Sequence, residues 1–128
     1  MSYTFDKFLP DVTPEEAEVR VRDALASRGF GVLTEIDVKA TLKKKLDVDV
    51  DPYKILGACK PELAHQAMTV EPKIGVMLPC NVILRQVDGG IEVSAVEPLA
   101  SMGAVDNPQL MEIASQVQDL LSSVIADL

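Results

Sequence analysis

The chain of 128 residues contains no tryptophan, and only 4% of its residues are aromatic. Its core must therefore be built mainly from aliphatic side chains, and these are plentiful because hydrophobic residues make up 48% of the sequence. A chain of this length and composition can bury a real core without disulfide staples. We expect one domain that spans residues 1–128.

Basic residues are also scarce. Twelve lysines and arginines stand against 20 aspartates and glutamates, and the formal net charge is -8. Nucleic acids and anionic lipids attract basic surfaces, so we expect neither as a partner. The sequence has no run of about 18 apolar residues that would span a membrane, and its start lacks the apolar region of a signal peptide. These features favour a soluble protein of the cytoplasm.

Residues with distinctive chemistry are few, and they lie close together. The only two cysteines, Cys59 and Cys80, and the only histidine, His65, fall between residues 53 and 82 with three of the eight prolines. Two cysteines neither require nor exclude a disulfide, but in a cytosolic protein we expect free thiols. Every strong candidate for chemistry lies in or beside this segment.

The apolar pattern predicts helices and strands that alternate, followed by a hairpin and a long final helix. Thr13 and Pro14 open a helix with a capping box, and Asp37 caps a second, short one. The turn at residues 88–90 joins two predicted strands, 73–85 and 90–98. From Asn107 onward, an apolar stripe recurs with helical spacing for five turns. This order favours an α+β fold, with helices on one face of a mixed or antiparallel sheet.

Cys59 lies between a predicted strand and a predicted helix that begins at Pro61. Unpaired backbone N–H groups and the positive end of the helix dipole can lower the pKa of a thiol at such a position. Lys60 adds a positive charge beside it. The functional interpretation is a reactive or ligand-binding thiolate; the alternative is a small, buried and inert residue, as most free cysteines are.

Cys80 and His65 offer weaker signals. Cys80 follows Pro79 within a predicted strand, where a proline implies a bulge or an edge, but a core cysteine is the simpler interpretation. His65 lies about a turn and a half along the helix from Cys59, where it could act as a third ligand or as a base. The spacing Cys-x5-His-x14-Cys matches no standard zinc pattern. Four scattered methionines are interpreted as core filling rather than as a copper site: Met68, Met77, Met102 and Met111.

Two short pieces carry a resemblance to a known family. The segments Gly57-Ala58-Cys59-Lys60-Pro61 and Leu78-Pro79-Cys80-Asn81-Val82 resemble the domain-of-unknown-function family 302, and the likeness runs from about Phe5 to the end of the chain. The resemblance implies a curved sheet with helices on one side, and a dimer. It implies no activity and no catalytic residues. It supports the interpretation of Cys59 and Cys80 as a pair, because each of them lies in one of the two segments that carry the resemblance.

Three hypotheses follow, in order of preference. In the first, the protein is a binding module in which Cys59 and Cys80 hold a soft metal ion, a haem-like cofactor or a small thiol-reactive ligand. Lys60, His65 and Asn81 are the other candidate ligand contacts. In the second, the protein is an interaction protein that only dimerises. In the third, it is a thiol enzyme, with Cys59 as the thiolate, Cys80 as the resolving partner and His65 as a possible base.

Overall fold

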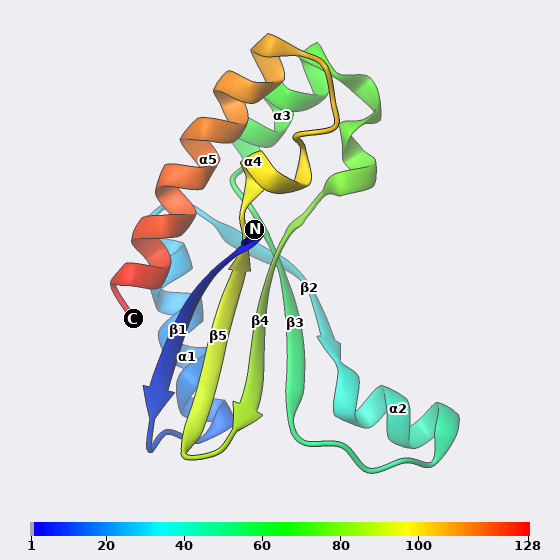
Figure 1. Cartoon of the computed structure of the whole chain (residues 1–128), viewed down its shortest axis with the longest axis vertical. Helices are drawn as coiled ribbons and strands as arrows, with labels where there is room; N and C mark the ends of the chain where they lie inside the picture. Colours follow the sequence, from blue (N-terminus) through cyan, green and yellow to red (C-terminus); the bar gives the residue numbers. More distant parts are fainter. Residues whose placement is uncertain (1) are drawn as a thin grey trace.

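Five antiparallel strands form an open sheet in the computed structural model, which describes residues 2–128 (Figure 1). The order across the sheet is β1-β5-β4-β3-β2. The sequence left a mixed or an antiparallel sheet open, and every neighbouring pair is antiparallel. The strands are β1 (Thr4–Pro10), β2 (Gly31–Asp37), β3 (Tyr53–Cys59), β4 (Cys80–Val87) and β5 (Gly90–Val96).

The helices occupy three places around this sheet. Two long helices, α1 (Pro14–Ser27) and α5 (Pro108–Ala126), cover one face. Three shorter elements gather beyond one end of the sheet, beside the first half of α5, while α2 (Val38–Leu46) projects at the other end (Figure 1). The gathered elements are α3 (Pro61–Val70), the 3-10 helix η1 (Pro72–Met77) and α4 (Pro98–Ser101). The predicted α+β fold is confirmed.

The caps read from the sequence are present. The Thr13 hydroxyl accepts a hydrogen bond from the Glu16 N–H, and the Glu16 carboxylate accepts one from the Thr13 N–H, both at 3.1 Å. The Asp37 side chain likewise accepts from the Ala40 N–H at 2.9 Å at the start of α2. Asn107 caps α5. Such caps satisfy backbone donors that the first turn of a helix leaves unpaired.

The predicted strand over residues 73–85 is wrong in its first half. Residues 72–77 form η1 instead, and β4 begins only at Cys80. Pro79 has no N–H to give to a strand ladder, so pairing starts after it. The proline therefore precedes the strand and does not create a bulge within it. The Leu78–Pro79 peptide bond is cis. The short helix α4 was not predicted at all.

Two clusters of apolar side chains lie between these elements. The sheet cluster fills the space between the sheet, α1 and the second half of α5, and includes Leu25, Leu56 and Val82. The helical cluster lies among α3, η1, α4 and the first half of α5, and includes Leu63, Met102 and Ile113. Among the buried members of the two clusters within residues 2–128, Phe30 is the only aromatic side chain, as the composition leads one to expect. Within residues 2–128, no helix is long and apolar enough to cross a membrane.

Candidate functional site

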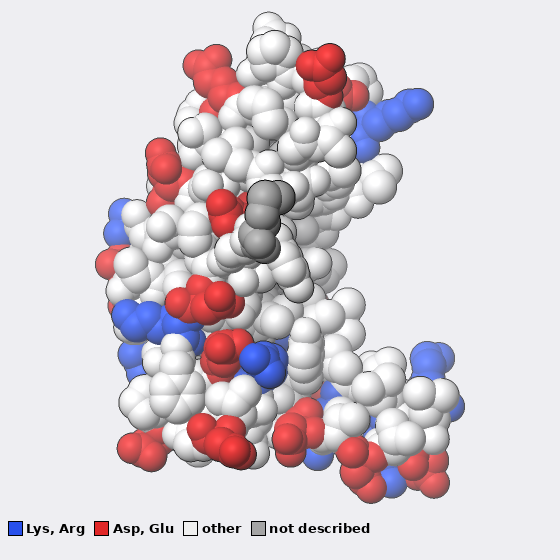
Figure 2. Space-filling model, in the orientation of Figure 1, with Lys and Arg blue, Asp and Glu red and all other residues white. Residues whose placement is uncertain are grey.

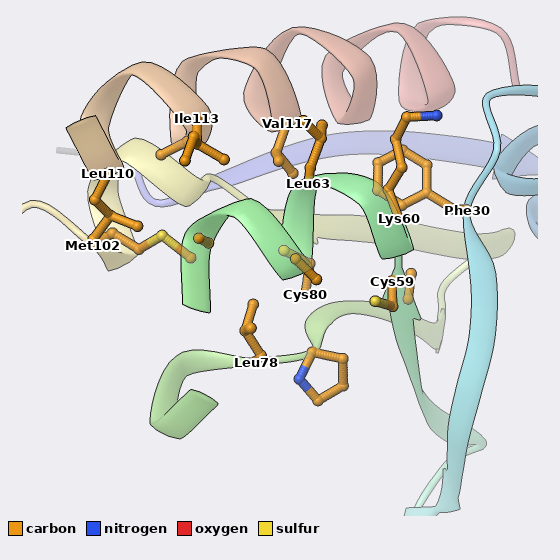
Figure 3. A pocket seen from close by; sticks show the side chains of 15 residues that line it. Phe30, Cys59, Lys60, Leu63, Leu78, Cys80, Met102, Leu110, Ile113 and Val117 are labelled. Carbon is orange, nitrogen blue, oxygen red and sulfur yellow. The ribbon is translucent and has the colours of Figure 1, made fainter. Parts of the chain in front are cut away.

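A narrow cavity of about 40 Å³ lies where the sheet cluster meets the helical cluster (Figure 3). Its walls come from α3, α4, α5 and the neighbouring ends of β3 and β4. Cys59 and Cys80 both line it, although 20 residues separate them in the sequence. Among the residues that line this cavity, Lys60 is the only one whose side chain contains nitrogen or oxygen outside a proline ring.

The pairing of β3 with β4 brings Cys80 beside the end of β3 that carries Cys59. Ala58 and Cys80 are Cα partners across the two strands, so their side chains point to the same face, towards the helices. Cys80 is consequently 6% exposed. Cys59 is the last residue of β3, where the chain turns into α3, and it lies partly exposed at the rim of the cavity. Both cysteines are free thiols.

Gly57 allows the two cysteine-bearing segments to approach. A Cβ atom at this position would collide with the Thr34 hydroxyl on one side and the Pro79 ring on the other. Only glycine lets Pro79 pack so closely on β3. The Gly-Ala-Cys and Leu-Pro-Cys pieces of the sequence are thus two halves of one packing arrangement, and that arrangement places Cys80 beside the end of β3.

The expectation of a lowered thiol pKa at Cys59 is wrong. Burial raises the pKa of Cys59, and the carboxylate of Glu62 in the first turn of α3 raises it further. Lys60 is not among the groups that shift this pKa, and its ammonium donates to the Arg28 carbonyl at 3.1 Å. Burial, and then the neighbouring Cys59, raise the pKa of Cys80 to about 11. Both thiols are protonated at neutral pH, so neither is a resting thiolate.

The other candidate residues are divided between three places. Lys60 lines the cavity with the cysteines. Asn81 follows Cys80 in β4, so its side chain points to the opposite face of the sheet, where it lies with Tyr53 and Arg85. His65 is exposed on α3 and does not line the cavity. In the part of the chain that the structure describes, no three His, Cys, Asp or Glu side chains come together to hold a metal ion.

One wall of the cavity could not be predicted from the sequence. Met102 ends α4, is 5% exposed and lines the same cavity as the two cysteines. It lies 22 residues beyond Cys80, outside the cysteine-bearing segment, and the four methionines looked alike in the sequence. Met68 and Met77 are exposed, whereas Met102 is buried. No local pattern separates them, because their burial depends on how α4 packs against α5.

The size of the cavity limits what can occupy it. An engineered protein cavity of about 150 Å³ accommodates benzene, and the volume here is about 40 Å³. A haem-like cofactor, which was one of the expected ligands, is far too large for this cavity. A single ion or a ligand of a few atoms does.

An open antiparallel sheet, helices on one of its faces and a cavity lined by sulfur define a small α+β protein. Residues 7–128 match the family described as "Domain of unknown function DUF302". The chain belongs to this family, as the two motif pieces predicted.

The fold is also that of a solved structure. The crystal structure of an uncharacterized conserved DUF302 protein from Bacillus stearothermophilus matches with a TM-score of 0.90 and 25% sequence identity, over 98% of each chain. No protein with a curated description matches this chain. The family and the related structure therefore agree on the fold, and neither description names an activity.

Proposed function

We propose that this protein is a small cytoplasmic binding module, one domain over residues 1–128, whose site is the cavity at Cys59 and Cys80. Its ligand is a soft metal ion or a small thiol-reactive molecule. The observation that carries the proposal is that the only two cysteines of the chain open into one cavity. Two free thiols support the cytoplasmic assignment, because reducing compartments keep cysteines unpaired.

The chemistry of the cavity favours a ligand that binds sulfur strongly. Hydrocarbon and sulfur make up nearly all of its walls, so a hard cation would lose its water and find no oxygen ligands in exchange. The thiols are protonated at neutral pH, so a metal ion must displace their protons. Soft ions form thiolate bonds strong enough for this exchange. The Lys60 side chain lines the cavity, and its ammonium donates to the Arg28 carbonyl at 3.1 Å.

The raised thiol pKa values count against the thiol-enzyme hypothesis. A nucleophilic or redox cysteine works as the thiolate, and such residues normally have a lowered pKa. In this site burial raises the pKa of Cys59. His65, the proposed base, is exposed on α3 and away from the cavity. Binding therefore remains the preferred function, and the enzyme hypothesis ranks last.

Titration with Hg(II), combined with counting of free thiols, tests the binding site. One Hg(II) per chain should protect both thiols, and Cys59→Ser or Cys80→Ser should each weaken binding by at least a hundredfold. Circular dichroism of each variant serves as the control for folding. If both variants bind Hg(II) as tightly as the native protein, or if two ions bind to separate thiols, the proposal is wrong.

The second candidate function, a dimerising interaction protein, is favoured by the α2 arm, which we define as residues 38–50. Helix α2 has nine residues and none is buried, although an isolated helix of this length is marginal in water. Figure 2 shows the arm standing away from the body of the molecule, with a hollow between it and the opposite end. Four large apolar side chains on the arm and the adjoining strand are exposed: Leu33, Ile36, Leu46 and Val48.

We infer that a second copy of the chain covers this arm. The arm carries four lysines and two aspartates, whereas the chain as a whole has a net charge of -8. A second copy therefore presents a mainly acidic surface to a basic arm, and apolar side chains between them would be buried on contact. A homodimer of this kind is compatible with the binding site, which lies at the other end of the sheet (Figure 1).

Sedimentation and light scattering test the homodimer. Leu46→Glu should convert a dimer to a monomer, because Leu46 is 66% exposed in the single chain. The matched control is Val19→Glu, at a similarly exposed position on α1, which should leave the dimer intact. A concentration of about 100 µM lies far above the dissociation constants of specific dimers, which are about 1 µM or lower. A native protein that is still monomeric at this concentration would contradict the inference.

A further inference from the structure

We propose that in the homodimer the α2 arm of each copy lies in the hollow of the other copy. This inference rests on the homodimer proposed above, and it deepens that proposal by naming the surface that receives the arm. The hollow lies beside β2, between the arm and η1 (Figure 1, Figure 2). Strand β2 forms this edge of the sheet, and within residues 2–128 it pairs with β3 alone.

Exposed apolar side chains gather on the three elements around this hollow. Within residues 2–128, ten large apolar side chains are exposed, and six of them belong to β2, the arm or η1. These elements make up only about a fifth of the chain, so such a concentration marks an interaction surface. The six residues are Leu33, Ile36, Leu46, Val48, Val76 and Met77. Val76 of η1 is the most exposed of them, at 89%.

The width of the hollow admits a helix but not a whole domain. Gly31 at the start of β2 lies opposite Cys59, from which the chain continues into α3 and η1, and the arm begins at the other end of β2, after Asp37. The seven residues of β2 therefore separate η1 from the arm, and at 3.3 Å per residue they span roughly 20 Å. A helix with its side chains is about 10–12 Å across. The hollow can thus receive one slender, projecting element.

The arm is the element of a second copy that meets this requirement. Helix α2 is the one α-helix within residues 2–128 that has no buried residue. The arm is also braced before it binds, because Asp37 caps α2 and the Lys39 ammonium donates to the Val50 carbonyl at 2.8 Å. An element that already has its bound shape loses little conformational freedom when it docks.

A two-fold axis makes this exchange reciprocal. When the arm of one copy enters the hollow of the other, the second arm enters the first hollow, so every contact occurs twice. The arm, β2 and η1 together provide about 26 residues per copy, and a standard interface uses about 20–30 on each side. Lys73 is the only charged residue of η1, so apolar side chains carry its contact with the lysine-rich arm.

Sedimentation of Val76→Glu, at the far side of the hollow from the arm, tests the inference. The substitution should leave the fold intact because Val76 is almost fully exposed in the single chain. It should raise the dissociation constant of the dimer by at least about thirtyfold, as the loss of a central interface contact does. Val19→Glu on α1 is again the matched control and should dimerise as the native protein does. Circular dichroism checks the fold of each variant.

A mixture of Leu46→Glu and Val76→Glu chains provides a second test. Each variant alone loses both arm-in-hollow contacts of the dimer, because one has a damaged arm and the other a damaged hollow. A mixed dimer keeps one native arm in one native hollow, so the mixture should associate at least about tenfold more tightly than either variant alone. Fluorescence-detected sedimentation with one variant labelled measures this difference.

The outcomes separate this inference from the homodimer on which it rests. If Leu46→Glu is monomeric while Val76→Glu dimerises as the native protein does, the arm lies in the interface but not in the hollow, and this inference is overturned while the homodimer stands. A mixture that associates no more tightly than its components overturns it as well. If the native protein is monomeric, both proposals fail.

Discussion

The sheet cluster and the helical cluster differ in how completely they are filled. Leu25, Leu56 and Val82 of the sheet cluster are fully buried, and they link the sheet to α1. In the helical cluster, Leu63 and Ile113 retain slight exposure and line the cavity. Close packing secures the fold at one end of the molecule. Where the two clusters meet, incomplete packing leaves space beside the two thiols, and there we place the function.

The largest expected effect comes from truncating one leucine in each cluster. Leu25→Ala should lower the free energy of unfolding by about 3–5 kcal/mol, because it opens a new cavity in a filled core. Leu63→Ala should cost nearer to about 2 kcal/mol, since its side chain already faces empty space. Urea unfolding of the two variants measures both values. Equal losses would show that the clusters are packed alike.

A smaller effect is expected where the two cysteine-bearing segments meet. Gly57→Ala should cost about 1–3 kcal/mol, because the new methyl group collides with Thr34 and the Pro79 ring. It should also weaken Hg(II) binding, since the segment that carries Cys80 must shift. Gly31→Ala is the control, because a Cβ at that position meets nothing within 4 Å. A fully stable Gly57→Ala protein would contradict the close approach.

The smallest effect is a dependence of stability on pH that arises from Cys80. Its folded pKa is about 11, whereas an unfolded thiol titrates near 8.5. The unfolded chain therefore releases a proton first, so this contribution to stability is full below about pH 8.5 and is lost as the pH rises to 11. Cys80→Ala should lose less stability between pH 8 and pH 10.5 than the native protein does. Identical losses in urea unfolding would place Cys80 in a solvated environment.

Much of the fold could be predicted because the signals are local. Caps at Thr13, Asp37 and Asn107, the hairpin turn, and the stripe of the last helix all depend on residues a few positions apart. The strand expected at residue 73 was wrong because Pro79 prevents pairing before Cys80. The position of α4 depends on a bond to Gln118, a distant residue that no local pattern reveals.

The site was predicted only in part. The cysteine pair came from the rarity of the two residues and from the motif pieces. Strand alternation already implied that Asn81 and Cys80 point to opposite faces, so Asn81 could have been set aside from the sequence alone. The direction of the Cys59 pKa shift could not be predicted from the sequence. Burial and the Glu62 carboxylate raise this pKa, and both effects depend on how the chain folds. Met102 required the tertiary structure.

The most direct test of the central claim is a crystal structure of the protein loaded with Hg(II), with the metal located by anomalous scattering. We predict one ion in the cavity, bonded to the sulfurs of both Cys59 and Cys80, with these two sulfurs within roughly 4–5 Å of each other, as two bonds to one metal require. An ion bound to one thiol alone, or located at His65 on the surface of α3, would contradict a shared site.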